Sequence, residues 1–85
     1  MAATVVAWDV QLVWRRRREG KHTLTLNADD DAMLRETLEQ LTRQRMGKGW
    51  RGDLSEWSIV VSNPRNGRRE ATVTIDQAGH TKVER

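Results

Sequence analysis

The sequence predicts a small α+β domain in which one helix packs on one face of a four-stranded antiparallel sheet. Two stretches near the start of the chain and two near its end alternate apolar with polar residues, which is the period of a β-strand. Between them, apolar residues recur at the spacing of an α-helix. The order of elements is therefore β-β-α-β-β. One helix on one side of the sheet is the economical way to bury both apolar faces.

Residues 4–14 and 21–28 are predicted to form an antiparallel hairpin. In the first strand one parity is strongly apolar, and it comprises Val6, Trp8, Val10, Leu12 and Trp14. Residues 21–28 alternate in the same way. The polar segment 15–20 joins the two strands, and we expect Gly20 to supply the turn.

Residues 30–46 are predicted to be the helix, with Leu34, Leu38 and Leu41 on its apolar side. Asp29–Asp31 mark its start, where carboxylates cap free N–H groups and suit the helix dipole. A calcium loop would instead place its ligands at alternate positions around a glycine. We therefore predict capping rather than a metal site, and we expect Gly47 to end the helix.

The second half of the sheet is predicted at residues 55–62 and 69–76, joined by a turn at Asn66-Gly67. Their inward residues are Trp57, Ile59 and Val61, then Ala71, Val73 and Ile75. Residues 81–83 either form a short fifth strand or fray. The other sheet face carries Val5, Val13 and Val60 among polar residues, so it is either solvated or paired in a homodimer.

The composition fits a single cytoplasmic domain over residues 1–85. Cysteine is absent, which excludes disulfides and thiolate metal sites and suits a reducing compartment. Asp9 interrupts the first apolar run, which lacks a basic flank, so we expect a strand there rather than a signal peptide. No stretch approaches the roughly 20 apolar residues of a membrane span, and we expect no membrane partner. Trp8, Trp14 and Trp57 are predicted to belong to the core rather than to a ligand cage.

The predicted strand directions gather positive charge at one end of the sheet. The tip of the first hairpin, residues 15–22, and the segment 43–51 at and after the end of the helix both fall at that end. Together they hold nine of the fifteen basic residues, which we call the basic pole: Arg15, Arg16, Arg17, Arg18, Lys21, Arg43, Arg45, Lys48 and Arg51. The net charge of +3 therefore understates the local positive field.

A basic pole can bind phosphates, acidic protein surfaces or anionic lipids. Arginines outnumber lysines twelve to three, which favours bidentate contacts, although GC-rich coding produces the same bias. Trp50, between Lys48 and Arg51, either stacks on a base or folds over the edge of the core. We predict a non-enzymatic binding module whose partner is nucleic acid, with binding residues Arg15, Arg16, Arg17, Arg18, Lys21, Arg43, Lys48, Trp50 and Arg51.

The sequence contains few of the residues and motifs that are typical of catalytic sites. Its two histidines, His22 and His80, lie far apart along the chain. Nucleophile-elbow, Walker and GxGxxG motifs are all missing, so we expect neither enzymatic activity nor a cofactor.

The alternative function is a protein–protein interaction module, such as an adaptor, an inhibitor or a self-associating subunit. Such a module would use a sheet edge or the semi-polar face.

Overall fold

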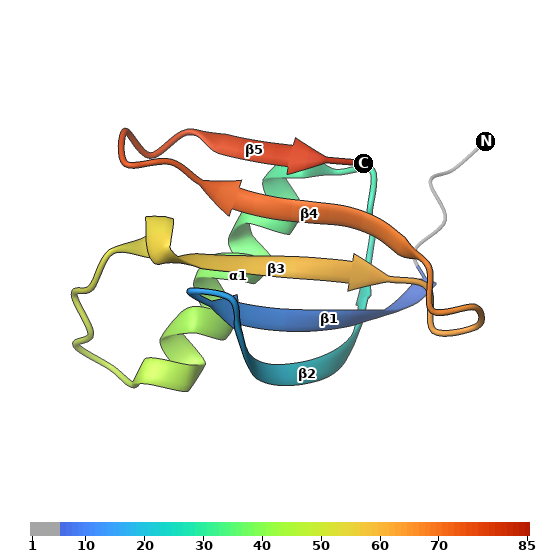
Figure 1. Cartoon of the computed structure of the whole chain (residues 1–85), viewed down its shortest axis with the longest axis horizontal. Helices are drawn as coiled ribbons and strands as arrows, with labels where there is room; N and C mark the ends of the chain where they lie inside the picture. The colour runs from blue at the N-terminus through green and yellow to red at the C-terminus, as the bar shows by residue number, and fades with distance from the viewer. Residues whose placement is uncertain (1–5) are drawn as a thin grey trace.

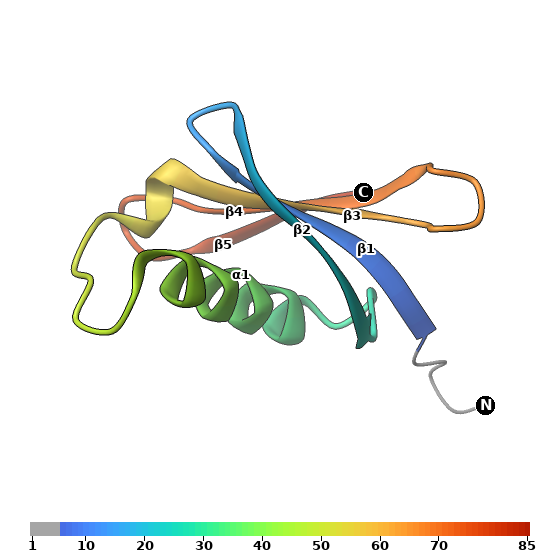
Figure 2. The ribbon, with the colours of Figure 1, turned by 90° about the horizontal axis from the view of Figure 1, so that it is seen from below.

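A computed structural model describes residues 6–85 as a five-stranded antiparallel sheet with one α-helix on one face (Figures 1 and 2). The elements are β1 (Val6–Trp14), β2 (Arg17–Leu26), α1 (Asp31–Met46), the 3-10 turn η1 (Leu54–Glu56), β3 (Trp57–Ser62), β4 (Arg69–Ile75) and β5 (Thr81–Glu84). The strands lie side by side in the order β2-β1-β3-β4-β5. The predicted α+β class is confirmed, but the order is β-β-α-β-β-β rather than β-β-α-β-β, because residues 81–84 form the short fifth strand that was one of the two alternatives for them.

The additional strand, β5, is held by contacts between residues far apart in sequence. The Arg35 guanidinium donates hydrogen bonds to the Gly79 carbonyl and, at 2.9 Å, to the Thr81 hydroxyl. Arg85 binds the Asp31 carboxylate at 2.6 Å, which ties the end of β5 to the start of α1. These contacts add to the pairing of β5 with β4 and to the local hydrogen bonds of the turn between them, in which the Asp76 N–H donates to the His80 carbonyl at 2.9 Å.

The helix follows its predicted boundaries closely. Asp30 is the N-cap, and its carboxylate accepts a hydrogen bond from the Met33 N–H at 3.1 Å. At the other end the Gly47 N–H donates to the Arg43 carbonyl at 2.8 Å. The three predicted helix leucines are buried against the sheet, where the core includes Val10, Leu12, Leu34, Leu38, Leu41, Trp57, Ile59, Val61, Ala71, Val73 and Ile75. Trp57 is buried, and Trp8 and Trp14 are partly buried against this core, as predicted.

The first hairpin differs from its prediction in a way that matters for the basic residues. Its turn is Arg15-Arg16, both with positive φ (46° and 69°), rather than a turn at Gly20. Gly20 lies inside β2 at φ 148°, beside a β-bulge where the pairing shifts from Leu12–Gly20 to Val13–Arg18. The glycine signal in the sequence therefore marks a bulge, and β2 begins four residues earlier than predicted.

The third strand begins at Trp57, two residues later than predicted, because residues 54–56 form η1. The Asp53 carboxylate caps η1 by accepting a hydrogen bond from the Ser55 N–H at 2.9 Å. β4 ends at Ile75, close to the predicted boundary.

The face of the sheet opposite α1 has no helix or strand over it in the described chain, and we call it the open face (Figure 2). Register pairs Val13 with Ser58 and Val60 with Gln11 on this face. Val5, which we also predicted there, lies outside the described residues. Among residues 6–85, α1 is the longest helix, and neither it nor any other is long and apolar enough to cross a membrane.

Candidate functional site

The two segments predicted to form the basic pole meet at one end of the sheet but lie on two sides of it, and Lys21 lies farther along β2, opposite Gln11. The β1–β2 turn and the loop from α1 to η1 are at the same end of the strands in Figure 1. In Figure 2 the hairpin turn rises on the side of the open face, whereas the loop lies on the side of the helix. The predicted site residues therefore divide into two groups, one on the hairpin and one at the end of α1 and in the loop after it.

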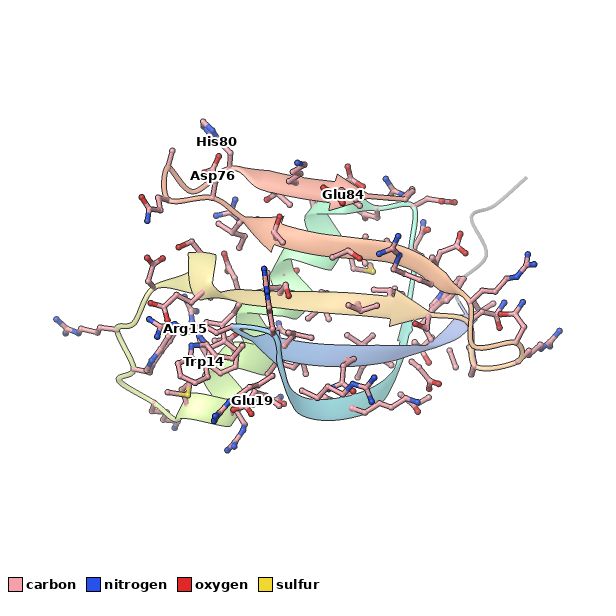
Figure 3. The ribbon with its side chains drawn as sticks, in the orientation of Figure 1. Trp14, Arg15, Glu19, Asp76, His80 and Glu84 are labelled. Atoms are coloured by element: carbon pink, nitrogen blue, oxygen red, sulfur yellow. The ribbon has the colours of Figure 1, made fainter. Side chains whose placement is uncertain are left out.

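Arg15 is occupied by contacts within the protein (Figure 3). Its guanidinium binds Glu56 through two hydrogen bonds, Nε to Oε2 at 2.9 Å and Nη2 to Oε1 at 3.0 Å. The Trp14 indole N–H donates to the same carboxylate at 3.1 Å. Hydrogen bonds from Arg15 and then from Trp14 hold the pKa of Glu56 below its ordinary value of 4.5. Glu56 thus fixes the hairpin turn against η1.

This contact should make stability depend on pH. Because the folded-state pKa of Glu56 is lowered, the contact stabilises the fold above about pH 4.5 and is lost as the pH falls through the lowered pKa. We expect Glu56→Gln to be less stable than the parent protein near pH 7, in urea unfolding followed by tryptophan fluorescence. The difference should shrink as the pH falls through the lowered pKa of Glu56 and the parent carboxylate takes up its proton. A difference that stays constant across this range would contradict the assigned role of the carboxylate.

Two further cations of the basic pole have acidic neighbours. Arg45 lies 3.6 Å from Glu19, and Lys21 lies 3.5 Å from Asp9. Both distances are long for an ion pair, and both cations are more than half exposed, so these pairs contribute little to stability. The basic residues without a side-chain hydrogen bond or ion pair to any of residues 6–85 include Arg16, Arg17, Arg18, Arg43, Lys48 and Arg51, all exposed.

Trp50 folds over the edge of the core, the second of the two arrangements considered for it. It is partly buried and packs edge-to-face on Trp57, with 6.1 Å between ring centroids. Gly52 allows this packing, because a Cβ atom there would overlap the Trp50 indole. The ring is therefore part of the tryptophan cluster with Trp14 and Trp57.

The hairpin cations face a shallow groove on the open face, which we call the sheet groove. Arg16, Arg18 and Lys21 line it, over a floor that includes Val13, Gln11 and Val60, and its volume is about 410 Å³. A bulge bends its strand and increases the local twist. The bulge beside Gly20 accounts for the way the hairpin turn rises above the open face in Figure 2. The Gln11 amide braces the bulge by donating to the Gly20 carbonyl at 2.8 Å.

Gln11, Val13 and Val60 are groove residues that the binding-site prediction did not include. Their outward parity was visible in the sequence, but their proximity to Arg16 depends on the bulge, which shifts the register by one residue. A regular strand through Gly20 would place Glu19 opposite Val13, and only the bulge places Arg18 there. Comparison of the chain with known proteins gives no matching family model, curated protein or solved structure.

Proposed function

We propose that this protein is a non-enzymatic binding module that binds nucleic acid through the basic residues of its first hairpin. The observation that carries the proposal is the backbone of Arg16. Its φ of 69° lies in the left-handed region, where a side chain costs about 1 kcal/mol or more compared with glycine. Two-residue turns of this kind favour Asn-Gly.

Arg15 also has a positive φ, and its contact with Glu56 offsets part of the backbone cost there. Arg16 has no side-chain hydrogen bond or ion pair to any of residues 6–85. The two-residue turn imposes positive φ at this position but does not require an arginine there, and residues kept in spite of such a backbone cost are typical of functional sites. Arg17 and Arg18 follow directly, so a run of exposed guanidiniums surrounds the strained position. Guanidiniums match phosphate geometry through bidentate hydrogen bonds, which favours nucleic acid as the partner.

The variant Arg16→Gly should separate stability from binding. Glycine adopts positive φ freely but loses more entropy on folding, so we expect a net gain of about 0.5–1 kcal/mol and a Tm higher by about 2–8 °C. The same variant should bind a labelled nucleic acid several-fold more weakly in fluorescence anisotropy at about 0.1 M salt. Lys48→Ala removes the same charge outside the hairpin and serves as the control. If Arg16→Gly binds as tightly as the parent protein, the hairpin is not the binding element.

The second candidate function is protein–protein interaction through the outer edge of β2. At ten residues β2 is the longest strand, and no strand of the described chain pairs with its outer edge. A groove of about 360 Å³ runs beside it, lined by Leu24 and Leu26 of β2 and by Met33 and Thr37 of α1. An extended segment can add to such an edge. Light scattering after size exclusion tests the self-associating form, and a monomer at every concentration would count against it.

A further inference from the structure

We infer that the sheet groove, rather than the whole basic pole, is the binding site, and that its ligand is the phosphate backbone of a nucleic-acid duplex. This inference rests on the proposed function and makes it more specific. The sheet groove brings together Arg16, Arg18 and Lys21 from the hairpin. The other group of cations, Arg43, Lys48 and Arg51, lies at the end of α1 and in the loop on the helix side.

The placement of the aromatic residues favours backbone contacts over base stacking. The chain has four tryptophans and no phenylalanine or tyrosine. Trp57 is buried, Trp14 and Trp50 pack on it, and Trp8 packs against the same core. The open face therefore offers no aromatic platform on which the bases of a single strand could stack, and such platforms supply much of the affinity for single strands.

The groove itself suits a rigid, regularly charged ligand. Its cations lie on the β2 side of the groove, since the register places Arg18 of β2 opposite Val13 of β1 and Lys21 opposite Gln11. The floor between β1 and β3 is neutral at Gln11, Val13 and Val60. A duplex presents phosphates at fixed spacing, so binding it costs less ordering entropy than binding a flexible single strand. Because phosphate contacts carry no sequence information, binding should depend little on base sequence.

One acidic group in the groove opposes the ligand. The Asp9 carboxylate lies 3.5 Å from Lys21 Nζ and accepts a hydrogen bond from the Thr23 hydroxyl at 3.3 Å. Asparagine at this position can keep the hydrogen bond and removes the negative charge. Asp9→Asn should therefore bind a duplex several-fold more tightly, whereas Glu36→Gln, an exposed site on the helix, should change affinity little.

The main test compares two triple variants that remove the same charge from the two cation groups. One is Arg16→Ala/Arg18→Ala/Lys21→Ala in the sheet groove, and the other is Arg43→Ala/Lys48→Ala/Arg51→Ala outside it. Alanine at Arg16 keeps the left-handed backbone cost, so stability should stay close to that of the parent protein. The molecule is 39 Å long, which spans about 11 base pairs at 3.4 Å each, so labelled duplexes of about 16 base pairs are suitable.

We expect the groove triple to bind about 100-fold more weakly and to lower the magnitude of the salt slope by about 2.7, as for three phosphate contacts. The other triple should stay within about threefold of the parent protein. Duplexes should bind at least tenfold more tightly than single strands of equal length, and DNA and RNA duplexes run in parallel identify which backbone is preferred. Equal losses in both triples, or tighter binding of single strands, would overturn this inference while leaving the proposed function in place. If the parent protein binds none of these nucleic acids, the proposed function itself fails.

Discussion

Trp57→Ala should remove a large part of the stability of the domain. Trp57 is buried at the start of β3 and contacts both Trp14 and Trp50, each with 6.1 Å between ring centroids. Truncating a buried tryptophan costs about 3–5 kcal/mol, and a domain of this size has about 4–13 kcal/mol in total. We expect the Tm to fall by at least about 12 °C, measured by circular dichroism.

Trp50→Ala is the matched control for this prediction. Trp50 is only partly buried at the rim of the same cluster, so its loss should cost clearly less. The control also tests function, because Trp50 packs on the core on the helix side of the sheet and lies outside the sheet groove. Trp50→Ala should therefore keep its affinity for duplexes. If Trp57→Ala melts within a few degrees of the parent protein, the tryptophan cluster does not anchor this end of the sheet.

The second large effect should be the loss of nucleic-acid affinity with salt. Three cations line the sheet groove, and Arg69 pairs in register with Ser62 on the same face. Lys82, opposite Thr74, could add a fifth contact only by leaving Glu84, which lies 3.1 Å from its Nζ. Three to five phosphate contacts give a slope of log K against log salt between about −2.7 and −4.5. Affinity should thus fall about 40- to 500-fold between about 50 and 200 mM salt, measured by anisotropy. A slope near zero would exclude phosphate contacts as the source of binding.

Local patterns in the sequence predict most of the fold. The helix was predictable because the leucine spacing, the Asp30 N-cap and the C-terminal Gly47 all lie within one continuous segment of the sequence. The buried residues of β3 and β4 followed from strict alternation. The fifth strand could not be decided in this way, because Thr81–Glu84 is short and its pairing with β4 is supported by contacts distant in sequence, from Arg35 to Thr81 and from Arg85 to Asp31.

The candidate site was less predictable, since it depends on contacts across the chain. Arg15 turns the hairpin because it binds Glu56, which is 41 residues away, so no local rule identifies Arg15-Arg16 as the turn. The strand directions were enough to infer that the two basic segments lie at the same end of the sheet. Their separation onto two sides of the sheet could not, because it arises from the bulge at Gly20 and the twist that accompanies it.

The most direct test of the sheet groove as the binding site is a map of backbone amide shifts in NMR spectra during titration with a duplex of about 16 base pairs. Lys21, Gln11 and Val60 form one row across the open face, from β2 through β1 to β3. We expect the largest shifts along this row and at Arg16 and Arg18. The α1 helix and residues 47–53 should change little. The largest shifts in α1 or in residues 47–53, with the open face unaffected, would contradict the assignment of the sheet groove.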